Sequence, residues 1–166
     1  VWEMGMSQYG ELARLSEMAR PDVGVINGIG TAHIEFFGSR ENILKAKLEL
    51  LRGMREGAPL ILNGDDELLW GLRGSLPYRV LYYALENPEA EVRGEVTESG
   101  AEGQTLRLLF ADGARIERRL PAAGRHNASN ALAAAAVGSV LGLAPEEIAF
   151  DAFRGVGGRQ NIVRKY

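Results

Sequence analysis

Two short apolar runs on either side of a strongly helical segment constrain the fold of this chain more than any other feature. Residues 23–26 read Val-Gly-Val-Ile and residues 59–62 read Pro-Leu-Ile-Leu, and an asparagine follows each run. Such runs are typical of strands that are buried in the centre of a parallel sheet. Between them, residues 41–54 carry apolar side chains at helical spacing. The alternation predicts an α/β fold with a mostly parallel, doubly wound sheet.

Other segments of the first half extend this pattern. Residues 1–5 are predicted to end another buried strand, and residues 9–19 are predicted to form a helix. Residues 27–38 contain glycines and are predicted to form a loop. Asp66 is expected to cap a short helix that runs to Leu72.

The pattern changes near Tyr78, where apolar and polar residues begin to alternate between turn signals. Asp112-Gly113 is the strongest of these signals for a hairpin. The alternation predicts an antiparallel β lobe over about residues 78–121, beside the main sheet, with strands at 79–84, 90–98, 104–110 and 114–120. Helical spacing returns at residues 127–141 and 145–153, and a last strand is predicted near residues 161–163.

Composition narrows the class of protein. At 166 residues the chain has the size of one domain, and its net charge of −3 argues against nucleic acid as a partner. It contains no cysteine, which excludes disulfides and thiolate metal sites and favours a reducing cytoplasm. No apolar run approaches the roughly 20 residues that cross a bilayer, so membrane insertion is not expected. Because the sequence starts at a valine, we expect a piece of a longer protein.

Lys47 occupies an unusual place in the predicted helix over residues 41–54. On a helical wheel it falls in the middle of the apolar face that includes Leu44 and Leu50, whereas Lys45 points the opposite way. Burying an unpaired ammonium is costly, so Lys47 is expected to be paired, neutral or modified. The alternative is a lysine that reaches the surface along its aliphatic stem.

Glu3 and Asn27 each lie at the carboxyl end of a predicted core strand, and His33 follows in the loop after the second of these strands. Open α/β sheets bind their ligands at this edge. A carboxylate and a neutral imidazole suit Mg²⁺ or Mn²⁺ when phosphate oxygens or water complete the shell. The alternatives are a surface carboxylate and a histidine that packs in its loop.

Asn127 and Asn130 stand three residues apart at the start of a predicted helix, so both amides face the same way over its first turn. Paired amides offer the donors and acceptors that read a purine edge, whereas a single asparagine there would be an ordinary N-cap. Arg159, which follows two glycines, is suited to phosphate or ribose.

The chain contains no Gly-x-x-x-x-Gly-Lys-Ser/Thr phosphate loop. Gly28-x-Gly30 suggests a dinucleotide fingerprint, but His33 occupies the position of the third glycine and the following residues are predicted to form a loop. These features indicate the body of a nucleotide-dependent enzyme domain without its phosphate cradle.

Several segments follow one another in an order that is more specific than any one motif. They are Glu3-Met4-Gly5-Met6, Gly10-Glu11-Leu12, Arg20-Pro21-Asp22-Val23, Ala32-His33-Ile34-Glu35, Gly38-Ser39-Arg40-Glu41-Asn42-Ile43, Ala46-Lys47-Leu48-Glu49 and Gly124-Arg125-His126-Asn127-x-x-Asn130-Ala131. Together they resemble the Mur ligase family, the ATP-dependent amide ligases of peptidoglycan synthesis. The resemblance covers nearly the whole chain and implies that residues 1–166 are an incomplete central, ATP-binding domain.

The resemblance also implies roles for single residues. Glu3 and His33 look like Mg²⁺ ligands, and Lys47 looks like the lysine that CO₂ carbamylates in this family. Carbamylation would explain an inward lysine, because it replaces a cation by an anion that can bind metal. These three residues form the implied catalytic set, and the implied ATP contacts are Asn127, Asn130 and Arg159.

The order of motifs is most like that of family members that add D-alanyl-D-alanine to UDP-N-acetylmuramoyl-tripeptide through an acyl phosphate. The resemblance implies further domains of the same protein, an N-terminal one for the UDP substrate and a C-terminal one for the amine, and the chain alone is expected to be inactive. The sequence departs from the family pattern at Gly28 and Ser7, where asparagine is common. The alternatives are a related ligase of the folylpolyglutamate or cyanophycin synthetase type and a non-catalytic nucleotide-binding domain.

Overall fold

The computed structural model describes residues 1–153. The first half of the chain forms α1 (Glu11–Ala19), β1 (Gly24–Ile26), α2 (Ile34–Phe37), α3 (Arg40–Lys47), the 3₁₀ helix η1 (Leu48–Arg52), β2 (Pro59–Asn63) and α4 (Glu67–Trp70). The second half forms β3 (Arg79–Ala84), β4 (Val92–Gly100), β5 (Gly103–Leu109), β6 (Arg115–Leu120), α5 (Arg125–Val140) and the 3₁₀ helix η2 (Pro145–Glu147). Within these described residues, no helix combines the length and the apolar content needed to cross a bilayer.

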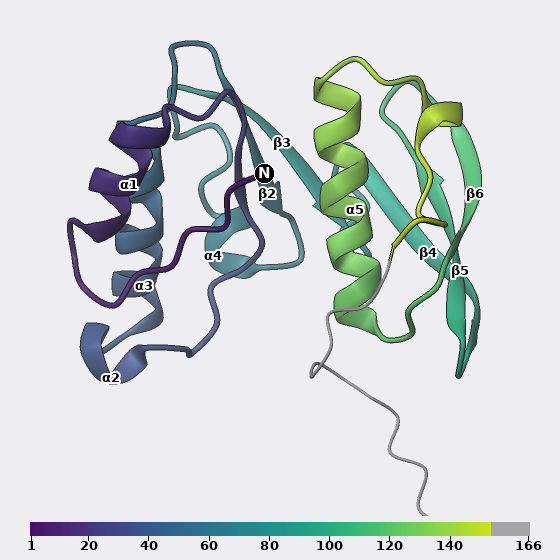
Figure 1. The fold of residues 1–166 in the computed structure, drawn as a ribbon, viewed down its shortest axis with the longest axis horizontal. Helices are drawn as coiled ribbons and strands as arrows, with labels where there is room; N and C mark the ends of the chain where they lie inside the picture. Colours follow the sequence, from purple (N-terminus) through teal and green to yellow (C-terminus); the bar gives the residue numbers. More distant parts are fainter. Residues whose placement is uncertain (154–166) are drawn as a thin grey trace, which may run out of the picture.

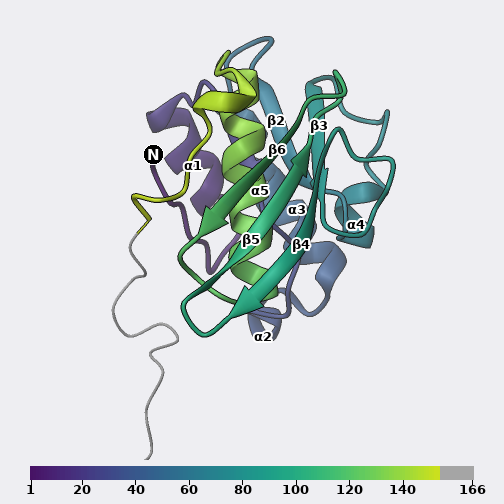
Figure 2. The same cartoon turned by 90° about the vertical axis from the view of Figure 1, so that its right-hand side faces the viewer.

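The six strands form one sheet in the order β1-β2-β3-β4-β5-β6. Strands β1 to β4 pair in parallel, and β4, β5 and β6 pair antiparallel. The predicted α/β fold with a mostly parallel sheet and an antiparallel part is therefore confirmed. Figure 2 shows β4, β5 and β6 crossing one face of α5.

The predicted limits of the antiparallel lobe differ from the observed pairing. Residues 79–84 form β3, which pairs in parallel with β2, so the antiparallel part starts only at β4. The connection between β2 and β3, which includes α4, is long enough to return from the carboxyl end of β2 to the amino end of β3, as a parallel pair requires. The antiparallel strands then continue the same sheet rather than forming a lobe beside it.

Helices cover both faces of the parallel strands, as a doubly wound sheet requires (Figure 1). In β2, Leu60 and Leu62 belong to a core that they share with Ile43 of α3. Ile61 points the other way, into a second core with Leu132 of α5. Leu60, Ile61 and Leu62, the three central residues of β2, are fully buried, which explains why the run reads as continuously apolar.

The helix predicted over residues 41–54 is split into α3 and η1. Ser39 starts α3, because its hydroxyl oxygen accepts from the backbone N–H of Asn42 at 3.2 Å. At the other end, the N–H of Leu48 is shared between the carbonyls of Leu44 and Ala46, and the chain continues from there as the 3₁₀ helix η1.

Three further sequence predictions of local structure were wrong. Residues 1–6 form no strand, and Val1 is fully exposed, because no other strand within residues 1–153 pairs with this segment. The predicted loop over residues 27–38 contains the short helix α2. The helix predicted at 145–153 stops after η2, where Ile148 is extended and Arg118 donates to its carbonyl. The strand predicted near 161–163 lies outside the described residues.

Candidate functional site

The carboxyl ends of the parallel strands and the start of α5 enclose an open pocket of about 410 Å³. Strand β2 ends at Asn63 at this edge, and Arg125 contributes from α5. Open α/β sheets bind ligands at this place. The pocket is lined by Arg40, Asn63, Asp65, Asp66, Glu67, Leu85, Arg125 and Ser129.

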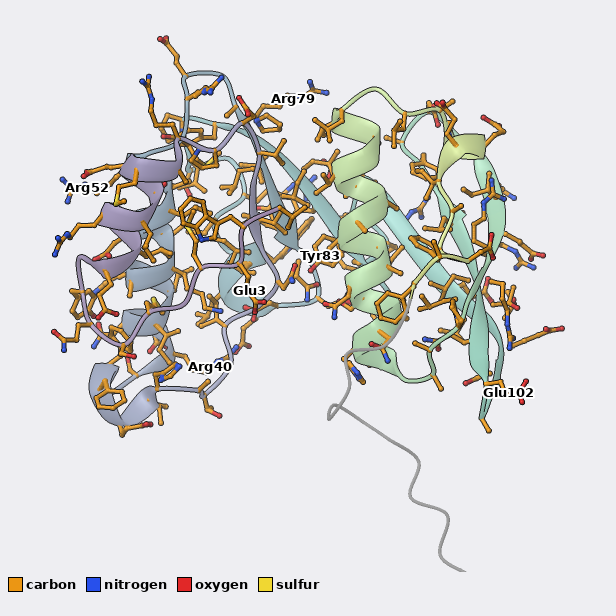
Figure 3. The ribbon with its side chains drawn as sticks, in the orientation of Figure 1. Glu3, Arg40, Arg52, Arg79, Tyr83 and Glu102 are labelled. Atoms are coloured by element: carbon orange, nitrogen blue, oxygen red, sulfur yellow. The ribbon has the colours of Figure 1, made fainter. Side chains whose placement is uncertain are left out.

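Asn27, the first residue after β1, is held from two sides. Its carbonyl accepts from Nδ2 of Asn63 at 3.0 Å, and its Oδ1 accepts from the hydroxyl of Tyr83 at 3.1 Å. The Tyr83 hydroxyl also forms a hydrogen bond with Ser129 of α5, and burial raises the pKa of this phenol far above its usual range. Tyr83 therefore connects the loop after β1 to α5, and Figure 3 shows it where the strands meet that helix.

The next two residues of this loop are held by charged side chains. The carbonyl of Gly28 accepts from Nζ of Lys47 at 2.5 Å. The N–H of Ile29 donates to Oδ2 of Asp66 at 2.6 Å, and the Ile29 carbonyl accepts from Nε of Arg40 at 2.9 Å. The Gly28–Ile29 peptide is thus bound on both its carbonyl and its N–H.

Lys47 points inward from α3, as its helical phase predicted, and its side chain is half-buried, whereas Lys45 is exposed. Burial lowers the pKa of the Lys47 ammonium, and the negative charge of Asp66 partly opposes this change. A lysine with a lowered pKa is more often a neutral amine, and a neutral amine is the form that reacts with an electrophile such as CO₂.

Glu3 and His33 are both exposed, and neither lines the pocket. His33 has a left-handed backbone with φ of 65°, and its carbonyl accepts from Phe36 at 3.0 Å, so it begins α2. Within residues 1–153 no three His, Asp or Glu side chains form a ready metal site. An exposed carboxylate and imidazole nevertheless suit Mg²⁺ of the kind held mainly by nucleotide phosphates and water. In the view of Figure 3, Glu3 projects between α3 and α5.

The start of α5 carries the predicted adenine contacts. Gly124, with φ of 98°, is the N-cap, so neither Asn127 nor Asn130 has the ordinary N-cap role. Nδ2 of Asn127 donates to the carbonyl of Ala123 at 2.7 Å, and Asn130 is exposed. Arg159 lies outside the described residues, so its predicted ATP contact remains a prediction.

Sequence reasoning missed Asp65, which organises the loop after β3. Its carboxylate accepts from the N–H groups of Leu85, Glu86 and Asn87 at 2.8 to 3.0 Å, and Nη2 of Arg125 lies 3.5 Å from it. The available signal was the sequence Asn-Gly-Asp-Asp at the end of an apolar run, where carboxylates collect at the edge of a sheet.

The comparisons with known proteins agree with this arrangement. A family model described as "Mur ligase middle domain" matches residues 1–138. The UDP-N-acetylmuramoyl-tripeptide–D-alanyl-D-alanine ligase of Bacillus subtilis is 37% identical over 158 residues, which are 95% of this chain and 32% of that ligase. The Escherichia coli ligase of the same name is 35% identical over 146 residues, or 86% of this chain and 31% of that protein.

Solved structures show the same fold. A crystal structure of MurF from Acinetobacter baumannii superposes with a TM-score of 0.89 at 30% identity, over 99% of this chain and 36% of that one. MurF from Thermotoga maritima in complex with ADP superposes with a TM-score of 0.80 at 25% identity, over 96% of this chain and 36% of that one. The chain spans about a third of the length of the curated relatives it matches. With a family model that covers residues 1–138, the chain belongs to the Mur ligase family.

Proposed function

We propose that this chain is the ATP-binding central part of a ligase that joins D-alanyl-D-alanine to UDP-N-acetylmuramoyl-tripeptide in the cytoplasm, for peptidoglycan synthesis. The observation that carries the proposal is the half-buried Lys47, whose amine lies against the Gly28 carbonyl at the ligand-binding edge of the sheet. The names and structures of the relatives support the same activity.

The proposed reaction has two steps. A carboxylate oxygen of the tripeptide attacks the γ-phosphorus of ATP, the bond to the bridging oxygen breaks, and ADP leaves. The amine nitrogen of D-alanyl-D-alanine then attacks the acyl carbon, a C–N bond forms, phosphate leaves and the nitrogen gives up a proton. Asn127 and Asn130 would orient the adenine ring, and Arg159 would contact the nucleotide.

The proposal assigns the metal to three residues. Glu3, His33 and a carbamylated Lys47 would hold Mg²⁺ together with phosphate oxygens and water. When bound, Mg²⁺ offsets negative charge on the phosphoryl oxygens. The exposure of Glu3 and His33 leaves both side chains accessible to a nucleotide that brings the metal.

Other parts of the same protein would supply what this chain does not contain. The sequence has no phosphate loop, and backbone N–H groups with a loop lysine normally supply most of the binding energy for a triphosphate. Separate N-terminal and C-terminal domains would bind the UDP substrate and D-alanyl-D-alanine, consistent with relatives about three times as long.

The test is ADP release by the full-length ligase that contains this chain. ADP release over many turnovers is expected only when both the UDP-tripeptide and D-alanyl-D-alanine are present, because without the amine the enzyme stops after the first step. Lys47→Ala is expected to lower kcat by about 100-fold or more, because an electrostatic group at the reacting phosphoryl is lost. Lys45→Ala is the matched control, since Lys45 is exposed on the same helix, and its kcat is expected to equal that of the parent.

Three outcomes would contradict the proposal. Equal kcat for Lys47→Ala would remove Lys47 from the mechanism. Turnover with glutamyl or aspartyl acceptors in place of D-alanyl-D-alanine would favour a ligase of the folylpolyglutamate or cyanophycin synthetase type. Nucleotide binding without turnover on any of these acceptors would favour a non-catalytic domain.

A further inference from the structure

Asp66, like Asp65, is a carboxylate at the pocket that accepts from three backbone N–H groups, and the residues implied by family resemblance do not include it. Its side chain is only 10% exposed. Oδ1 accepts from the N–H groups of Leu68 and Leu69 at 3.0 and 3.2 Å, which caps α4. Oδ2 accepts from the N–H of Ile29 at 2.6 Å. Each carboxylate oxygen thus holds a different element.

The contact between Asp66 and the N–H of Ile29 fixes the orientation of a peptide group, whereas the other two contacts cap a helix. Asp66 binds the N–H of the Gly28–Ile29 peptide, and Lys47 donates to the carbonyl of that same peptide. Arg40 holds the following carbonyl, of Ile29, and its Nη2 lies 3.7 Å from Oδ2 of Asp66. Rotation of the peptide would break the contacts of both Asp66 and Lys47, so the carboxylate determines where the Gly28 carbonyl points.

The direction of the Gly28 carbonyl matters for a modified lysine. In carbamylation the lone pair of a neutral lysine nitrogen forms an N–C bond to the carbon of CO₂, and one proton leaves to solvent. The carbamate that results keeps one N–H. That N–H can donate to the Gly28 carbonyl as the amine does now, and the new carboxylate then lies on the other side of the nitrogen.

We propose that Asp66 is a positioning residue for Lys47: it holds the Gly28–Ile29 peptide so that the Gly28 carbonyl orients the nitrogen and directs its carbamate away from that carbonyl. This inference rests on the proposed function, because it concerns the carbamate assigned there to Lys47. Asp66 acts through the peptide and contacts no reacting atom in this account.

Asp66→Asn leaves a single acceptor oxygen for the two tasks of the carboxylate. An asparagine has one acceptor oxygen, so it can cap α4 or accept from Ile29, and its amide nitrogen then meets the other N–H as a second donor. Asp112→Asn is the matched control, because Oδ1 of Asp112 also accepts a backbone N–H, from Ala114 at 2.9 Å, in the hairpin between β5 and β6.

The experiment measures the Lys47 carbamate in the full-length ligase by ¹³C NMR, after equilibration with ¹³C-bicarbonate at fixed pH. The spectrum of Lys47→Ala identifies the Lys47 signal by its loss. Loss of the Asp66 charge by itself would favour the neutral Lys47 amine and so the carbamate, so a fall in the signal reports the lost hold on the Gly28–Ile29 peptide. We expect Asp66→Asn to lower the carbamate signal about tenfold and Asp112→Asn to leave it unchanged. Hydrogen exchange at the Ile29 amide is expected to be faster in Asp66→Asn than in the parent and unchanged in Asp112→Asn.

A second variant covers the case in which Asp66→Asn does not fold, which thermal unfolding would reveal. Arg40→Lys keeps a cation near Asp66 but loses the Nε donor to the Ile29 carbonyl, so it loosens the same segment from its other side. It is expected to lower the carbamate signal by a smaller factor than Asp66→Asn. An unchanged carbamate signal in a folded Asp66→Asn protein, or in Arg40→Lys if the first does not fold, would overturn the inference.

Turnover of the same samples separates this inference from the proposed function. A parent ligase that turns over without any Lys47 carbamate would overturn the inference and leave the ligase activity standing. A parent that shows the carbamate, loses it in Asp66→Asn and turns over none of the proposed substrates would support the inference and refute the proposed function.

Discussion

The parallel half of the molecule (β1 to β3 with α1, α3 and α4) and the antiparallel half (β4 to β6) hold their chain together in different ways. In the antiparallel half, the hairpins satisfy backbone groups through ladders between neighbouring strands. In the parallel half, the loops at the carboxyl edge have no ladder. Their N–H and carbonyl groups bind side chains that are distant in sequence, such as Asp65, Asp66 and Lys47.

The difference follows from how the strands are connected. An antiparallel pair needs only a tight turn, as at Asp112-Gly113, whereas the connections from β1 to β2 and from β2 to β3 return across the sheet and leave long loops at the edge. Buried polar groups in such a loop must find side-chain partners. Ligand-binding chemistry is therefore expected where these partners gather, and stability in the antiparallel half is expected to depend on backbone and apolar packing.

The largest expected effect concerns the closest backbone approach in the parallel half. A Cβ added at Gly53 would lie 2.0 Å from the backbone carbon and oxygen of Ser16 in α1, so main chain must move. Gly53→Ala is expected to lower the free energy of unfolding by about 3 kcal/mol. In the antiparallel half, the three atoms nearest to a Cβ at Gly94 would all belong to the Leu132 side chain, at 2.6 to 3.0 Å, and Gly94→Ala is expected to cost about 2 kcal/mol or less.

Urea unfolding of both variants and of Gly100→Ala checks this order. Gly100 has no atom within 4 Å of its added Cβ and serves as the control for a glycine without contacts. A cost for Gly94→Ala larger than that for Gly53→Ala would show that α5 is packed more rigidly than α1, and the contrast between backbone and side-chain contacts would fail.

Tyr83 joins the loop after β1 to α5 through its hydroxyl. Tyr83→Phe removes the hydroxyl that donates to Asn27 and binds Ser129, and it is expected to destabilise the protein by about 1 kcal/mol. It is also expected to weaken ATP binding, because α5 carries the proposed adenine contacts. Both effects can be measured in one titration series that combines thermal unfolding with calorimetry.

Tyr82→Phe is the matched control for that prediction. The Tyr82 hydroxyl lies on the opposite face of β3 and donates to the Leu69 carbonyl at 3.3 Å, which also accepts from the N–H of Leu72. A smaller loss of stability and unchanged ATP affinity are expected. Equal effects of the two substitutions on ATP affinity would show that the hydroxyl of Tyr83 does not connect the loop after β1 to α5.

Much of the fold could be predicted because periodicity and turn residues encode it locally. The run Pro59–Leu62 predicted β2, and helical phase predicted that Lys47 points inward while Lys45 does not. Residues 1–6 show the limit of this reasoning. Their apolar character suggested a strand, but a strand forms only beside a partner, and the sequence of this segment does not reveal one.

The candidate site was less predictable, because its contacts depend on sheet order rather than on local pattern. Asp66 was predicted only as the cap of α4, which is confirmed, and its bond to Ile29 spans 37 positions of sequence. The left-handed backbone of His33 also has no signal in its neighbours. The metal and nucleotide roles of Glu3, His33, Asn127, Asn130 and Arg159 stay predictions.

The smallest expected effect lies on the exposed face of the antiparallel half. Arg107 pairs with Glu95 and Glu117 at 2.9 Å each, but all three side chains are at least 43% exposed, and solvent screens such pairs strongly. Arg107→Gln is expected to leave the thermal unfolding midpoint nearly unchanged, and any difference is expected to vanish in about 1 M salt. A large loss that persists at high salt would mean that Arg107 acts through packing of its stem against the neighbouring strands β4 and β6. The antiparallel half would then depend on side chains from neighbouring strands as much as the parallel half depends on its buried carboxylates.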